Sequence, residues 1–100
     1  MSELATSVGR IVLDGVAEEV HVYMDESTIS LLFKADGDVV DRLLTAFTQV
    51  VRRRNELGTD IAVGFRRHGD RTASFTAPTR FGLNLVAEYA VETFQEAGLL

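Results

Sequence analysis

The stretch that decides the fold is VHVYMDESTISLLFK, residues 20–34. In both of its arms every second residue is apolar: Val20, Val22 and Met24, then Ile29, Leu31 and Phe33. An alternation with a period of two is typical of a β-strand that buries one face. The residues between the two arms, Asp25, Glu26 and Ser27, favour a turn. The stretch therefore predicts a β-hairpin with one buried face.

A helix is predicted directly after this hairpin. Asp36-Gly37-Asp38 is a helix-start signal, and we expect Asp38 at the N-cap. The apolar residues that follow keep to one side of a 3.6-residue period: Val40, Leu43, Leu44, Phe47, Val50, Val51 and Leu57. Gly58 is suited to end a helix, so the pattern predicts a helix over residues 38–57.

The same order of elements recurs in the second half of the chain. Two more strands are predicted from alternating apolar residues: Ile61, Val63 and Phe65, then Ala73, Phe75 and Ala77. Gly69-Asp70 predicts the tight turn between them, and Pro78-Thr79 is expected to end the last strand and cap a helix over about residues 80–97. The two units align at an offset of about 41–43 residues, which is a weak internal repeat.

These elements predict an α+β fold, with an antiparallel sheet of four strands and two helices on one face in ββα-ββα order. Residues 1–18 leave two alternatives, because their apolar residues fit helix spacing while Gly9 and Gly15 weaken a helix. Residues 10–13 favour a strand that enters an Asp14-Gly15 turn, which would be a fifth strand. One hundred residues fit one compact domain, residues 1–100.

Composition argues against several classes of function. The chain has no Cys, which excludes disulfides, thiolate nucleophiles and cysteine-bound zinc. Its two His have no ligand spacing, and its eight Gly do not cluster into a phosphate-binding loop, so we predict no metal and no other cofactor. No apolar run approaches the roughly 20 residues of a membrane span. We expect a soluble, cytoplasmic protein that is not an enzyme and has no membrane partner.

The charge of the chain is unevenly distributed. The net charge is −5, but residues 51–80 carry seven Arg and only three acidic residues. An acidic chain disfavours general nucleic-acid binding, because phosphate contacts dominate that binding. The arginine-rich block still permits a local anionic partner, and its candidate anion-binding residues are Arg53, Arg66, Arg67 and Arg71.

One predicted strand face groups four polar residues: Glu19, His21, Tyr23 and Asp25. They form either a proton-transfer site or the solvated face of an amphipathic strand. Neighbours on one strand face lie roughly 6.5–7 Å apart, so a His–Asp hydrogen bond is not ensured. We favour the solvated face and assign no catalytic residue.

The final helix has more apolar surface than one packing face requires. Its apolar residues spread over an arc of about 200°, whereas a helix on a sheet needs somewhat more than about 100°. We expect the excess to bind a partner, through Leu83, Ala87, Val91 and Phe94, while Val86 and Tyr89 face the sheet. The alternative is that the N-terminal segment covers this second face.

These observations support one hypothesis and two alternatives. The hypothesis is a small acidic, non-catalytic protein-interaction module (an adaptor, a chaperone-like protein or a regulator) that forms a homodimer through its C-terminal helix. The first alternative is a regulator that binds nucleic acid or another anion through residues 52–80. The second, weaker alternative is an enzyme built on His21 and Tyr23.

Overall fold

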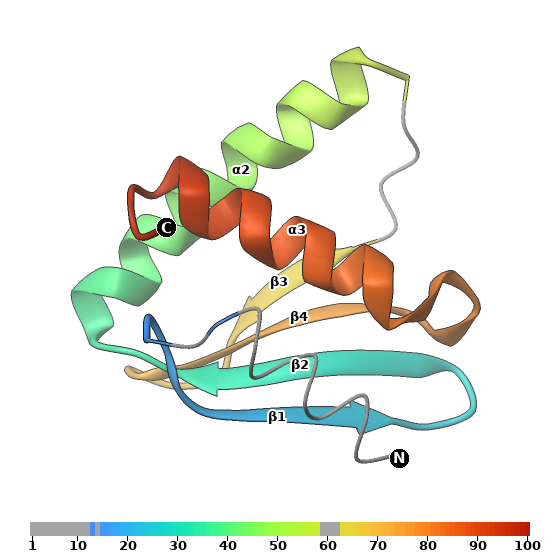
Figure 1. The fold of residues 1–100 in the computed structure, drawn as a ribbon, viewed down its shortest axis with the longest axis horizontal. Coiled ribbons are helices and arrows are strands. Elements are labelled where there is room, and N and C mark those ends of the chain that lie inside the picture. The colour runs from blue at the N-terminus through green and yellow to red at the C-terminus, as the bar shows by residue number, and fades with distance from the viewer. Residues whose placement is uncertain (1–12, 14, 59–62) are drawn as a thin grey trace.

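The computed structural model describes residues 13, 15–58 and 63–100. Its elements are, in chain order, β1 (Glu18–Met24), β2 (Thr28–Lys34), α2 (Gly37–Glu56), β3 (Gly64–Arg67), β4 (Thr72–Pro78), the 3-10 turn η1 (Thr79–Phe81) and α3 (Gly82–Glu96). The strands form one antiparallel sheet, and both helices lie on the same side of it (Figure 1). This confirms the predicted α+β class and the ββα-ββα order.

The order of strands in the sheet, β1-β2-β4-β3, gives the two ββα units equivalent places. The second strand of each unit lies in the middle, where Leu31 of β2 is opposite Phe75 of β4. The first strand of each unit, β1 or β3, is an edge. Each hairpin thus pairs internally, and the two hairpins join through their second strands.

Phe75 is at the centre of the core. It is fully buried, and its ring lies near the rings of four other phenylalanines, with centroid distances of 4.9 Å to Phe65, 5.8 Å to Phe33, 6.0 Å to Phe47 and 6.5 Å to Phe94. These separations are in the favourable range for aromatic pairs. The cluster takes residues from the sheet and from both helices, so it joins the two layers of the fold.

The start of α2 differs from the prediction. Asp36 is the N-cap, with an extended backbone, and its carbonyl accepts the Val40 N–H at 3.0 Å. Asp38 lies within the first turn, so its assignment as N-cap is wrong, although its charge there is favourable to the helix dipole. The predicted end is confirmed: Gly58 follows the helix with a φ of +76°, a conformation that favours glycine.

The start of α3 is also shifted. A single 3-10 turn precedes it, and Gly82, with a φ of +77°, separates this turn from the regular helix. Thr79 does not cap α3, because its hydroxyl donates to the Asp25 carbonyl at 3.2 Å and its N–H to the Ser27 carbonyl at 2.9 Å. These bonds tie the start of the last segment to the β1–β2 hairpin.

Most of the strand expected over residues 10–13 lies outside the described residues, as does Ile61 of the predicted third strand. Leu13 is described, and it is helical and fully buried. Its carbonyl accepts the N–H groups of Val16 and Ala17 at 3.2 and 3.1 Å. These local bonds belong to a helical turn, so the strand prediction is wrong at Leu13.

Candidate functional site

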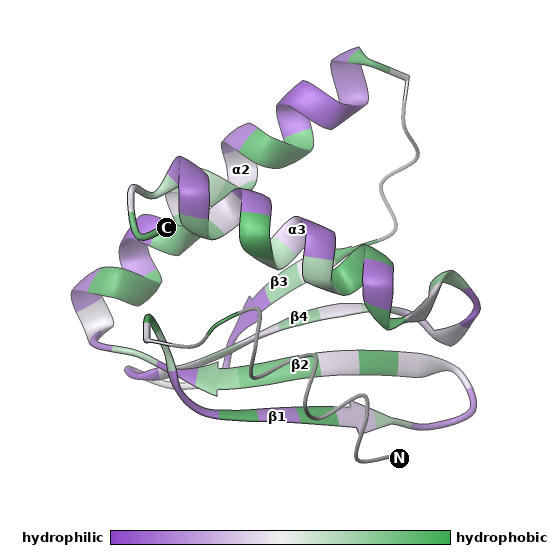
Figure 2. Cartoon of the chain, in the orientation of Figure 1, coloured by the Kyte–Doolittle hydropathy of each residue, from purple (hydrophilic) through white to green (hydrophobic). Residues whose placement is uncertain are grey.

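A hollow of about 810 Å³ lies between the C-terminal half of α2 and the outer face of α3, and we call it the α3 groove. In this region α2 rises away from the sheet as it crosses α3 (Figure 1). The apolar side chains that line it are Ala87 and Val91. Polar and charged side chains line the rest, and hydrophilic residues gather along the rising half of α2 (Figure 2).

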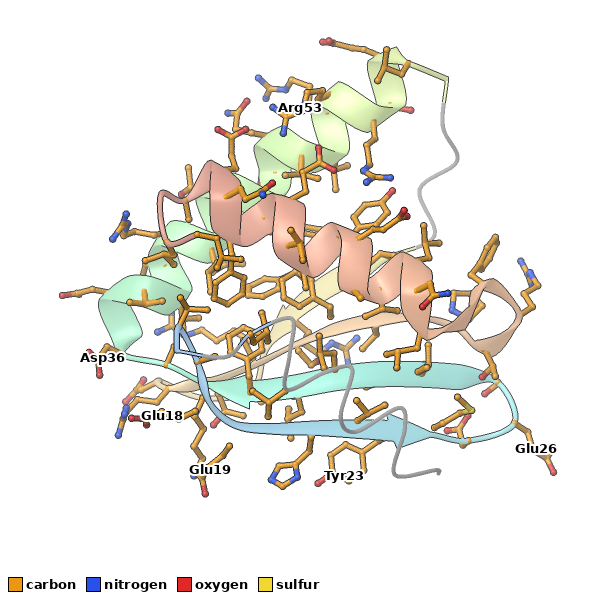
Figure 3. The ribbon with its side chains drawn as sticks, in the orientation of Figure 1. Glu18, Glu19, Tyr23, Glu26, Asp36 and Arg53 are labelled. Carbon is orange, nitrogen blue, oxygen red and sulfur yellow. The ribbon has the colours of Figure 1, made fainter. Side chains whose placement is uncertain are left out.

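Ion pairs hold this rising half of α2 to α3. Arg53, labelled in Figure 3, is paired with Glu92 at 3.1 Å and with Glu96 at 2.8 Å, and Arg54 is paired with Glu92 at 2.7 Å. Burial acts to raise the pKa of Glu92, but the hydrogen bonds from Arg54 and Arg53 outweigh it and hold the pKa below its ordinary value. The α3 groove therefore has walls that are fixed relative to each other.

The four residues predicted to bind a partner do not lie together. Phe94 is fully buried in the aromatic cluster, so its placement at a partner-binding surface is corrected. Leu83 is partly buried against the core, while Ala87 and Val91 line the α3 groove. The wide apolar arc of α3 has a structural cause, because the helix packs against the sheet on one side and against α2 on another. The alternative prediction, that the N-terminal segment covers the second face of α3, concerns residues that mostly lie outside the described part of the chain.

The four candidate anion-binding arginines are also dispersed. Three are paired with carboxylates of the protein itself: Arg53 as above, Arg67 with Asp41, and Arg71 with Glu18 and Asp36. Arg66 forms no ion pair with any residue in the described part of the chain. Arg66 and Arg67 are adjacent in β3, so their side chains project to opposite faces of the sheet.

Arg66 belongs to the open sheet face, the side of the sheet away from α2 and α3. The strand register places its residues in two rows: Tyr23, Ser30, Thr76 and Gly64 in one, and His21, Leu32, Ser74 and Arg66 in the next. Glu19 and Tyr23 point away from the helices in Figure 3. No described helix covers this face, and its side chains are mostly polar.

A hollow of about 490 Å³ on the open sheet face, the sheet hollow, is lined by residues of all four strands or their ends. His68 and Ser74 meet in it, with 2.8 Å between His68 Nε2 and Ser74 Oγ, and Ser74 is only 1% exposed. No motif in the sequence predicts this pair. The Gly69-Asp70 turn signal was available, but only the register of β3 with β4 brings His68 back onto Ser74.

The proton-transfer interpretation of the β1 face finds little support in the contacts. His21 and Tyr23 are exposed, with 6.2 Å between their ring centroids. Glu19 is bonded to Lys34 at 2.8 Å, and this hydrogen bond lowers the pKa of Glu19. Asp25 is bonded within its own turn. Both carboxylates therefore have partners other than His21, which favours the solvated-face interpretation.

Among the described residues, no three or more His, Asp or Glu are grouped so that they could hold a metal ion. Within the same part of the chain, no helix combines the length and the apolar character that crossing a membrane requires. Comparison with protein-family models, curated proteins and solved structures finds no match to this chain.

Proposed function

We propose that this protein is a small non-catalytic interaction module that forms a homodimer through the α3 groove. The composition of the groove supports this. Its apolar floor, Ala87 and Val91, is surrounded by charged and polar groups that include Arg53 and Arg54. Protein interfaces commonly have such an apolar centre and polar rim, and they are enriched in arginine.

Charge complementarity supports a second copy of the chain as the occupant. The α2 wall of the groove is basic, with Arg53 and Arg54, and the α3 wall carries Glu88 and Glu92. In a twofold dimer the same surface of each copy meets the other. Arg53, Arg54 and Glu92 are already paired within the chain, so the charge that two antiparallel copies would bring to each other's arginines is that of Glu88, which has no ion pair in the described part of the chain. Such complementarity contributes mainly to register and to the rate of association.

The observation that carries the proposal is the position of Val91. It is partly exposed in the monomer, and it lies in a groove whose walls are already joined by ion pairs. A preformed surface of this kind can bind with little backbone movement. The absence of Cys fits a reducing compartment, and we place the module in the cytoplasm.

Sedimentation equilibrium over about 1–100 µM tests self-association, since standard interfaces hold dimers in or below this range. The wild type is expected to be a dimer. Val91→Glu places a charge in the apolar centre of the interface and is expected to yield a folded monomer. The matched control is Leu44→Glu, which adds the same charge at a 37% exposed leucine of α2 that does not line the groove, and it is expected to remain a dimer.

Glu88→Lys is a second test variant, because Glu88 is exposed and its replacement is expected to leave the monomer folded. It reverses a charge of the acidic wall and is expected to weaken the dimer. A wild type that stays monomeric at about 100 µM would exclude self-association. Dimers weakened equally by Val91→Glu and Leu44→Glu would place the interface elsewhere.

A further inference from the structure

We propose that the sheet hollow binds a small phosphomonoester that carries a planar ring, of the class of nucleoside monophosphates. Arg66 and His68 would hold the phosphate, Ser74 would hold the His68 ring in place, and Tyr23 would stack on the base. The site lies on the opposite side of the sheet from the α3 groove, so it does not depend on the proposed dimer.

The phosphate end is a set of converging donors. Arg66 is beside Ser74 in the strand register, and its guanidinium has no ion-pair partner in the described part of the chain. Arginine is suited to phosphate because its N–H groups match two oxygens at once. Ser74 is only 1% exposed, so it acts through the exposed His68: when Ser74 Oγ donates to His68 Nε2, across 2.8 Å, the Nδ1–H of the imidazole is left to bond a ligand. The strand pairing gives these groups a rigid base.

The other end of the sheet hollow suits a ring. The Tyr23 side chain is 57% exposed, and the partly buried Leu32 adds apolar surface to the lining. Exposed aromatic rings on a sheet stack on nucleobases, because every base has a π-face. β1 and β4 are two strand spacings apart, and Ser74 lies one row further along the sheet than Tyr23, so the two residues are roughly 12 Å apart at the backbone, a span that a ligand of this class can cover.

The charges orient the ligand. Asp25 is the acidic residue of the lining, and it lies at the Tyr23 end, where its Oδ1 accepts the N–H groups of Ser27 and Thr28 at 2.7 Å each. Its charge keeps a phosphate away from that end, whereas Arg66 attracts one at the other. The volume of about 490 Å³ is within the usual range for small-molecule sites.

Titration of the ¹⁵N-labelled full chain with adenosine 5′-monophosphate, inorganic phosphate and adenosine, each alone, tests the proposal. We expect adenosine monophosphate to shift the resonances of Tyr23, Arg66, His68 and Ser74, and to bind more tightly than either half of the molecule. Arg66→Gln is expected to weaken its binding about tenfold or more, as loss of a charged hydrogen bond does. Tyr23→Leu should weaken binding of the nucleotide and leave binding of inorganic phosphate unchanged.

Arg52→Gln is the matched control, because it removes the same charge from an exposed arginine of α2, and it should bind as the wild type does. Ser74→Ala, which removes one hydroxyl, should also weaken binding. No shift at about 10 mM nucleotide, enough to occupy even a millimolar site, would overturn the proposal. So would equal losses in Arg66→Gln and Arg52→Gln, or much tighter binding of a single-stranded oligonucleotide than of the mononucleotide.

Discussion

The guanidinium carbon of Arg54 lies 4.2 Å from the centroid of the Tyr89 ring. The same guanidinium is paired with Glu92, one turn further along α3. Arg54 and Glu92 are both largely shielded from solvent, and Tyr89 is fully buried. This stacking and pairing fixes the rising half of α2 against α3, and it therefore determines the shape of the α3 groove.

Arg54→Ala is expected to lower the free energy of unfolding by about 1–2 kcal/mol, because it removes a cation–π contact and a shielded ion pair together. Urea denaturation measures this. Arg52→Ala is the control, since Arg52 is exposed on the same helix, and it should change stability by no more than about 0.5 kcal/mol. Equal losses in the two variants would show that the contacts of Arg54 with Tyr89 and Glu92 are not the cause.

The ion pairs of Glu92 should make the stability of the protein depend on pH. Its pKa is held below the ordinary value in the folded state, so the stability it contributes is present above the pKa of the unfolded chain and is lost as the pH falls through the folded pKa. Glu92→Gln should therefore be less stable than the wild type at pH 7, with the difference shrinking below about pH 4.3. Urea midpoints measured from pH 7 to pH 3 test this. A difference that does not change with pH would contradict it.

Phe94→Ala is expected to cost about 3–5 kcal/mol, because the side chain is fully buried against Phe33 and Phe75 and its removal leaves a cavity. Phe81→Ala is the control at a phenylalanine that is 39% exposed, and it should cost far less. Thermal unfolding of the two variants measures the difference. If Phe94→Ala altered the oligomeric state but left the monomer stable, Phe94 would belong to an interface after all.

Replacing Arg67 and replacing the adjacent Arg66 should change the stability of the protein by different amounts. Arg67 pairs with Asp41 of α2 and donates to the carbonyls of Gly69 and Asp70 at 2.9 Å each. Arg67→Ala is expected to cost about 1–2 kcal/mol, because these bonds join the β3–β4 turn to α2. Arg66→Ala should stay within about 0.5 kcal/mol of the wild type. A larger loss at Arg66 would mean that its side chain supports the fold.

Asp25 closes the β1–β2 hairpin with its two bonds to Ser27 and Thr28, and these backbone N–H groups lower its pKa. Asp25→Ala should be less stable than the wild type, and Asp25→Asn should be intermediate because it keeps an acceptor oxygen. The lowered pKa also means that this contribution is lost as the pH falls. Thermal melts at pH 7 give the order of the three proteins. Equal melting temperatures for all three would contradict it.

The elements themselves could be predicted because their signals are local. The alternation in residues 20–34 corresponds to β1 and β2, and Gly58 ends α2 with a positive φ, as such positions favour glycine. The predicted N-caps of the two helices were wrong, because more than one nearby residue can cap a helix. Asp38 and Thr79 are both residue types that cap helices well, but α2 already begins at Gly37 with Asp36 as its N-cap, and Thr79 bonds to the β1–β2 hairpin instead.

The candidate sites were less predictable, because they depend on pairings between distant residues. The arginines of residues 51–80 form a cluster in the sequence, but Arg53 is paired with α3 and Arg71 with Glu18 and Asp36, so no single patch results. His68 and Ser74 had no motif in common. Their contact follows from the register between β3 and β4.

By itself, the sequence determined the type and order of the elements and which residues are apolar enough for a core, since these depend on neighbours within a few positions along the chain. Only the tertiary structure decided which side of α3 each apolar residue faces. A helical wheel gives the width of the apolar arc, but Phe94 is buried and Val91 is partly exposed because of where α2 crosses α3 and how both meet the sheet. Those contacts join residues far apart in the chain, and no local pattern encodes them.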